Sequence, residues 1–163
     1  SIRSILLDDS KDRNPPYSVT ELLLYAADRA QHINEIIRPS LNKGDWVISD
    51  RFCGSTLAYQ GYGRKLDIKL IKDLETIATQ GISPDITFLL DIPIDESIKR
   101  RMNREEDRIE KEGREFLSNV SQGFKTLSKN HKWKTISALK SKEDIIFDIK
   151  HEINKLLTDK QYG

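Results

Sequence analysis

Three short apolar runs alternate with longer segments of helical periodicity, and this alternation constrains the fold more than any other feature of the sequence. The runs are predicted to form strands at residues 45–50, 85–91 and 133–137. A buried parallel strand is typically a short, nearly continuous apolar run, and strands that alternate with helices form βαβ units. The sequence therefore predicts a single three-layer α/β domain over residues 1–163, with a parallel sheet flanked by helices.

The segments between these runs carry apolar residues at the spacing of amphipathic helices. Residues 18–38 show the clearest pattern, and Ser18 followed by Glu21 predicts a capping box at its start. Asp67 is the predicted N-cap of the next long helix. That helix is predicted at residues 67–80, and further helices are predicted at 95–103, 111–130 and 141–158. Residues 1–7 are predicted to be the end of a helix, and residues 53–60 a loop with a short helix.

The first predicted strand ends in two charged residues, Asp50 and Arg51. In open parallel sheets, ligands bind at the carboxyl ends of the strands. A carboxylate there suits Mg²⁺, and a guanidinium suits a phosphate through paired hydrogen bonds. Asp50 is therefore a candidate metal ligand and catalytic residue, and Arg51 is a candidate phosphate ligand. The alternative is a surface ion pair after an edge strand.

Two further sets of side chains suit a planar base and its sugar. Tyr25 and Arg29 lie one helical turn apart, so a ring and a guanidinium could stack on a base and donate to its carbonyl edge. The alternative is a tyrosine at the rim of the core beside a solvated arginine. The second set follows the end of the first predicted strand. The alternative is that these polar side chains only form hydrogen bonds with the backbone of their own loop. It comprises Ser55, Thr56, Tyr59 and Gln60.

A dense run of mixed charge follows the helix predicted at 95–103. Phosphoryl transfer needs positive charge at the transferring group, and a mobile loop can deliver that charge on closure. We therefore expect a lid at about residues 100–110. The alternative is a salt-bridged, solvated helix end. The basic members of the run are Lys99, Arg100, Arg101, Arg104 and Arg108.

Composition limits the classes of partner. The formal net charge is +1, so no global field favours nucleic acid, and no apolar run approaches membrane-spanning length. Cys53 is the only cysteine, which excludes an internal disulfide framework and a cysteine-based zinc site. The three histidines lack ligand spacing, so a metal–histidine site is not expected. A reducing, cytoplasmic location is expected.

Separated motifs along the chain resemble those of the thymidylate kinase family, in the same order. Residues 50–61 (DRFCGSTLAYQG) are similar to its Asp-Arg-Tyr/His…Ala-Tyr-Gln-Gly signature. Residues 23–32 (LLYAADRAQH) resemble the helix that carries the thymine-stacking aromatic residue and its arginine. Residues 84–91 and 107–110 resemble the next strand and the end of the lid. The resemblance implies a P-loop kinase fold and the ATP-dependent phosphorylation of dTMP to dTDP with Mg²⁺.

The same resemblance implies roles for individual residues on the acceptor side. Arg51 would hold the dTMP phosphate and Asp50 would lie near the metal. Tyr25 would stack on thymine, and Arg29 would reach its carbonyl. The residues expected along the base and deoxyribose are Ser55, Thr56, Gln60 and Tyr59, of which Tyr59 would disfavour a 2′-hydroxyl.

On the donor and lid side, the resemblance implies catalytic lid arginines and an adenine-contacting segment. The arginine candidates are Arg104, which is favoured, and Arg100 and Arg101. Asp107 and Glu110 would border the sugar and phosphate. Ala138 and Leu139 match the adenine segment, although the family's Asp-Ala pairing is absent there.

One family motif has no counterpart: the sequence contains no G-x-x-x-x-G-K-[ST], the P-loop with which the family opens. We therefore expect roughly a fifth to a quarter of the protein to lie upstream of Ser1, and this part alone to be inactive. The alternatives are a related kinase with another acceptor and a non-catalytic nucleotide-binding fragment. The resemblance further implies a homodimer.

Overall fold

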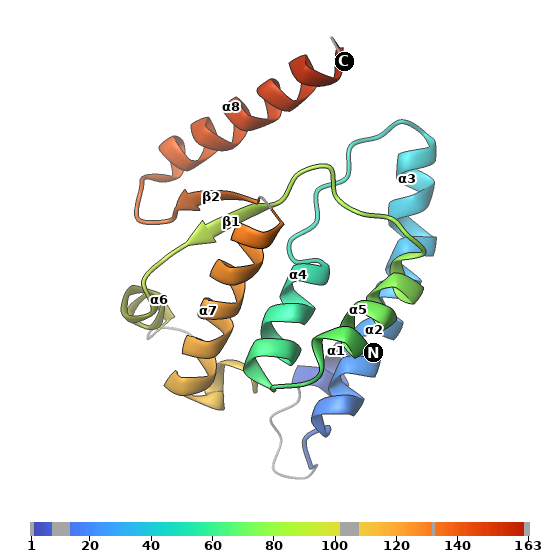
Figure 1. The fold of residues 1–163 in the computed structure, drawn as a ribbon, viewed down its shortest axis with the longest axis vertical. Coiled ribbons are helices and arrows are strands. Elements are labelled where there is room, and N and C mark those ends of the chain that lie inside the picture. Colours follow the sequence, from blue (N-terminus) through green and yellow to red (C-terminus); the bar gives the residue numbers. More distant parts are fainter. Residues whose placement is uncertain (1, 8–13, 102–107, 132, 162–163) are drawn as a thin grey trace. The chain divides into compact units, whose positions relative to one another are not determined.

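The computed structural model describes residues 2–7, 14–101, 108–131 and 133–161 (Figure 1). The chain divides into two compact units, Ser1–Ser83 with Arg104–Phe124 and Pro84–Asn103 with Lys125–Gly163. In the first unit the described residues form helices and their connections, whereas the second contains a pair of parallel strands. The predicted α/β class is confirmed.

The long helix predicted at residues 18–38 forms as a continuous helical stretch of three segments, two α-helical and one π-helical. It consists of α2 (Ser18–His32), the π-helical η1 (Ile33–Ile37) and α3 (Arg38–Asn42). Pro39 lies in the first turn of α3, where its missing backbone N–H is tolerated, and the π-helical η1 directly precedes that turn. Gly44, with φ of 81°, follows the end of the stretch.

Three further helical segments complete the part of the first unit that precedes residue 84. They are α4 (Cys53–Thr56), η2 (Leu57–Gly63, π-helical) and α5 (Ile68–Thr79), and the short α1 (Ile2–Leu7) lies against α2. The side chain of Asp67 accepts a hydrogen bond of 2.9 Å from the Lys69 amide, which confirms the predicted N-cap. α5 packs beside α2 (Figure 1). The buried apolar residues of these elements are Leu6, Leu22, Ala26, Ile33, Ile37, Leu57, Ala58, Ile71 and Ala78.

Two glycines allow η2 to approach α7 (Arg114–Asn130), which follows the short 3-10 segment η3 (Glu110–Glu112). A Cβ atom on Gly63 would lie 2.6 Å from the ring of Phe116. On the other side of the contact, a Cβ atom on Gly123 would lie 2.7 Å from the ring of Tyr62. Neither approach is available to a larger residue without displacing an aromatic ring, so both glycines serve close packing.

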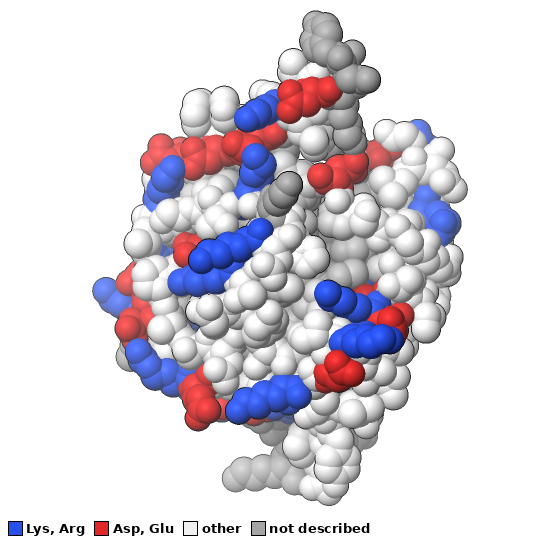
Figure 2. Space-filling model, viewed as in Figure 1, with Lys and Arg blue, Asp and Glu red and all other residues white. Residues whose placement is uncertain are grey.

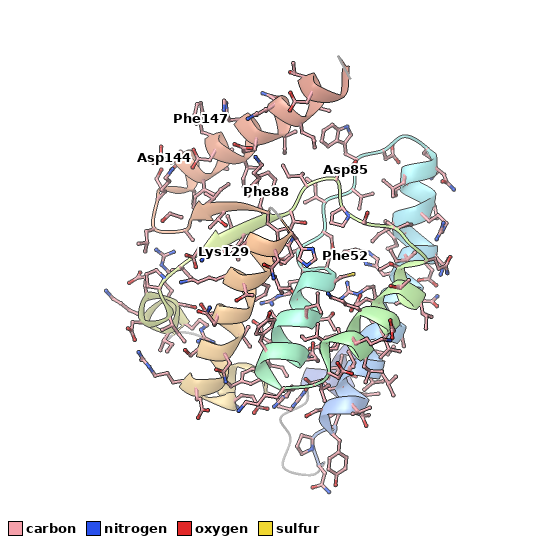
Figure 3. All side chains as sticks on the ribbon, in the orientation of Figure 1. Phe52, Asp85, Phe88, Lys129, Asp144 and Phe147 are labelled. Atoms are coloured by element: carbon pink, nitrogen blue, oxygen red, sulfur yellow. The ribbon has the colours of Figure 1, made fainter. Side chains whose placement is uncertain are left out.

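The second unit contains the two strands, β1 (Phe88–Asp91) and β2 (Lys134–Ser137), and the helices α6 (Ile94–Arg101) and α8 (Lys142–Gln161). The strands pair in parallel, with Phe88 opposite Lys134. This confirms the strands predicted within 85–91 and 133–137. α8 lies against β2, and its Phe147 is 70% exposed (Figure 3).

The strand predicted at residues 45–50 is wrong. Residues 45–49 have no regular secondary structure, and Ile48 is 93% exposed. A strand exists only where its backbone groups pair with a neighbour, and in the described part of the chain the pairing is confined to β1 and β2. The apolar composition of the run was therefore an insufficient criterion.

The described surface carries both signs of charge. Basic and acidic side chains are interspersed on the face shown in Figure 2, as the net charge of +1 leads one to expect. Among the described helices, none combines the length and the apolar character needed to cross a membrane.

Candidate active site

Arg51 lies where the irregular segment turns into α4, and its backbone has an unusual conformation. Its φ of 71° is in the left-handed region, which residues other than glycine rarely adopt, and its carbonyl accepts a hydrogen bond of 2.7 Å from the Ser49 hydroxyl. The guanidinium carbon lies 5.1 Å from the centre of the Tyr59 ring. The Arg51 side chain thus packs on Tyr59 of η2, the helical segment that follows α4.

The surroundings of Arg51 favour its charged form. The atoms packed around the guanidinium oppose its charge, but interactions with Tyr59, Asp50 and Tyr25 outweigh this effect and raise the pKa of Arg51 above its ordinary value. Three other predicted site residues therefore lie close enough to Arg51 to influence its charge. Asp50 itself is exposed.

Arg29 is held on three sides by residues of the same unit. Its Nη2 donates a hydrogen bond of 2.9 Å to Thr56 Oγ1, and its Nε lies 2.8 Å from Glu75 Oε2. The face of the guanidinium lies over the ring of Phe52, 5.0 Å from its centre. Phe52 immediately precedes α4 (Figure 3). The structure thus joins two predicted residues, Arg29 and Thr56, with Phe52 and Glu75.

The sequence contained a signal for Glu75 that was missed. It lies four residues after Ile71 and three before Ala78, on the buried side of α5, and is itself 6% exposed. Glutamate is almost never fully buried unless it is paired. A carboxylate within an apolar stripe therefore indicates a nearby cation.

A second buried carboxylate, Glu21, connects α2 with η2 and with Arg108, a basic residue of the charged run predicted as the lid. It is fully buried and accepts hydrogen bonds from Gln60 at 2.9 Å, from Arg64 at 3.2 Å, and from Arg108. Glu112 lies 2.6 Å from Arg64 and completes the network. Burial acts to raise the pKa of Glu21, but its hydrogen bonds to Arg108, Arg64 and Gln60 outweigh burial and lower it.

The contacts of Glu21 bear on two predictions, the capping box at the start of α2 and the place of Gln60 along the base. The capping box is wrong: the N-cap of α2 is Tyr17, without a side-chain hydrogen bond, because the Glu21 carboxylate points into the protein toward the arginines. Gln60, expected along the base, is 2% exposed, and its amide nitrogen donates to Glu21.

The lid candidates that the structure describes bind groups of their own unit. Arg100 donates hydrogen bonds of 3.0 Å to the Glu96 carboxylate and of 3.0 Å to the Ala138 carbonyl oxygen. It thereby connects α6 with the segment expected to meet adenine, where Leu139 is 56% exposed. Arg101 donates to the Ser97 carbonyl oxygen at 3.4 Å. Arg104 and Asp107 lie outside the described residues, as does the side chain of Glu110.

The described residues do not support a metal cluster or a cysteine nucleophile. They contain no group of three or more His, Cys, Asp or Glu side chains that could hold a metal ion. Burial and the neighbouring Glu75 raise the pKa of the Cys53 thiol to about 12, so Cys53 is not a thiolate nucleophile at neutral pH. Ser55 makes a backbone hydrogen bond of 2.9 Å to Phe52 at the start of α4.

Comparison with known proteins decides the family. The family model described as thymidylate kinase matches residues 1–149. The chain belongs to the thymidylate kinase family. Thymidylate kinases are phosphotransferases, so the chain belongs to a family of phosphotransferase enzymes. The predicted family and the predicted P-loop kinase fold class are confirmed.

Relatives within this family match nearly the whole chain. The thymidylate kinase of Prochlorococcus marinus (strain NATL2A) is 76% identical over 160 residues, which cover 98% of this chain and 75% of that protein. The thymidylate kinase of Prochlorococcus marinus (strain MIT 9312) is 52% identical over 160 residues, which cover 98% of this chain and 75% of that protein. A crystal structure of thymidylate kinase from Ehrlichia chaffeensis matches with a TM-score of 0.64 and 31% identity, covering 84% of this chain and 67% of that chain.

Proposed function

We propose that this protein phosphorylates dTMP to dTDP with ATP as the phosphoryl donor. The observation that carries the proposal is a pair of arginines in one compact unit, Arg29 and Arg51, each packed on an aromatic ring. One guanidinium suits a base carbonyl and the other a phosphate. Membership of the thymidylate kinase family supports dTMP as the acceptor.

On the acceptor side, each proposed role follows from a property of the side chain. Arg51 is charged at neutral pH, as arginine side chains are in proteins, and its guanidinium presents paired donors, so it would pair with the phosphate dianion. Tyr25, one turn before Arg29, would stack on the base. Arg29 would donate to the base carbonyl, with Thr56 beside it. Tyr59 would line the deoxyribose and leave no room for a 2′-hydroxyl.

Asp50 suits a Mg²⁺ site because the ion needs few ligands from the protein itself. Mg²⁺ in kinases is bound by one or two carboxylates, by water and by the substrate phosphates, so a single exposed carboxylate is compatible with it. When bound, the ion would neutralise charge on the phosphates. The lid arginines Arg104, Arg100 and Arg101 would add positive charge at the transferring group, and Ala138 and Leu139 would meet the adenine of ATP.

The test is an assay of ADP production by the purified full-length protein with a panel of nucleoside monophosphates. We expect turnover with dTMP to exceed that with dAMP by orders of magnitude. Equal turnover with both would overturn the proposal and favour a related kinase with another acceptor. Sedimentation of the same sample tests the homodimer that we propose with this activity, and cell fractionation tests the proposed cytoplasmic location.

A further inference from the structure

Glu75 is a buried charge that the proposed acceptor roles leave unexplained. Its side chain is 7% exposed, and among the described residues Arg29 is the cation within ion-pair distance of it. Removing a carboxylate from water is costly unless it is paired, so this contact decides whether Glu75 is tolerated in α5. The pairing also fixes one edge of the Arg29 guanidinium.

The contacts of Arg29 leave one part of its guanidinium for a ligand. Nε faces Glu75, Nη2 donates to Thr56, and one face of the plane packs on Phe52. The described protein atoms provide no hydrogen-bond partner for Nη1. Because a guanidinium is planar and rigid, fixing two edges and a face also fixes the direction in which Nη1 points.

The Arg29–Glu75 contact is an ion pair without hydrogen-bond geometry. Nε and both carboxylate oxygens of Glu75 are buried and make no hydrogen bond in the described structure, although Nε and Oε2 are 2.8 Å apart. Such a pair holds the guanidinium by charge and not by donor alignment. Neutralising Glu75 would therefore remove most of the restraint on this edge of Arg29.

We propose that Glu75 is a positioning residue for recognition of the acceptor base: it holds Arg29 so that Nη1 donates to a carbonyl of the pyrimidine. The inference rests on the proposed function, which assigns Arg29 to the base. It adds a consequence for specificity. Arg carries donors only, so a base with an amino group in place of the carbonyl meets donor against donor, and this discrimination depends on the fixed guanidinium.

The experiment compares steady-state kinetics of the full-length protein and its Glu75→Gln variant with dTMP and with dCMP. We expect KM for dTMP to rise roughly 10- to 100-fold, which corresponds to loss of one hydrogen bond to a charged group, with kcat little changed. We expect the ratio of kcat/KM for dTMP over dCMP to fall by a similar factor. Unchanged KM and ratio in a Glu75→Gln protein with a lowered melting temperature would assign Glu75 a purely structural role and overturn the proposal.

Two further variants make the result specific. Asp73→Asn removes an exposed carboxylate from the same helix, where it pairs with Lys69, and is expected to change neither KM nor the ratio. Glu75→Asp keeps the charge and draws it back by one methylene, so an intermediate KM is expected. If Glu75→Gln does not fold, Glu75→Asp decides, and wild-type KM and ratio in it overturn the proposal.

The proposed function and this inference fail differently. Absence of dTMP turnover in the wild type refutes the proposed function. Normal dTMP affinity in an Arg29→Ala variant refutes the assignment of Arg29 to the base. If Arg29→Ala weakens dTMP and Glu75→Gln then adds nothing in the double variant, the two residues act as one unit, as we propose. Full additivity contradicts the positioning role.

Discussion

Replacing Glu21 with glutamine should destabilise the protein strongly, because the change removes one charge from a buried network and keeps the shape of the side chain. Glu21 is fully buried and Arg108 is 8% exposed. After the substitution, Arg108 keeps the Leu6 carbonyl oxygen at 2.9 Å and Glu112 at 3.7 Å, whereas Arg64 keeps Glu112 at 2.6 Å. Only Arg108 thus loses its main counter-charge.

The magnitude follows from this asymmetry. Removing one partner of a buried ion pair costs about 3–5 kcal/mol, and the retained contacts of Arg64 place Glu21→Gln near 3 kcal/mol. For a chain of 163 residues, that corresponds to a fall in melting temperature of roughly 6–12 °C. Urea unfolding followed by circular dichroism measures the free energy directly.

The pH dependence gives a second check on Glu21. Its pKa is lowered in the folded protein, so its contribution is present above the ordinary value of 4.5 and is lost as pH falls through the folded pKa. The difference between wild type and Glu21→Gln should therefore be full at pH 7 and shrink in acid. A matched control, Glu152→Gln, breaks the surface pair with Lys134 at 2.7 Å and should leave the midpoint unchanged. A loss below 1 kcal/mol at pH 7, or one that is equal at pH 7 and pH 3, would refute the reasoning.

Three further predictions concern packing, reactivity and binding. Gly123→Ala should cost about 1–3 kcal/mol in urea unfolding, because the new Cβ would lie 2.7 Å from the Tyr62 ring; a stabilised variant, the usual result in a helix interior, would contradict this. Cys53 should react slowly with a thiol reagent at pH 8 in the native protein and quickly in urea, because its pKa is raised to about 12; equal rates would contradict the burial. Arg51→Lys should raise KM for dTMP despite the retained charge, because an ammonium cannot form the paired hydrogen bonds; wild-type KM would refute the phosphate role.

The helix start at Asp67 was predicted correctly because its signal is local, whereas the predicted strands depended on a partner elsewhere in the chain. Asp67 caps α5 through an amide two residues away. The strands within 85–91 and 133–137 are also apolar runs, and each has the other as its partner. The run at 45–50 has the same composition, but its partner is not among the described strands. Strand formation depends on the neighbour as much as on the run.

The site shows the same division between local and distant determinants. The motif at 50–61 and the Tyr25–Arg29 spacing identified the acceptor candidates from contiguous sequence. The partners that orient these candidates are distant in sequence: Gln60 donates to Glu21, 39 positions away, and Arg29 donates to Thr56, 27 positions away. The capping box failed for this reason, since a carboxylate that could serve its own helix end is taken by arginines elsewhere in the chain.

The backbone of Arg51 has a practical consequence for engineering. A left-handed φ of 71° at a residue with a Cβ stores roughly 1 kcal/mol of strain, which glycine would release. A library selected only for heat resistance would therefore enrich Arg51→Gly and discard the guanidinium that we assign to the phosphate. Directed evolution of this protein should therefore score turnover in every round, because a gain in stability at this position removes the side chain that we propose binds the phosphate.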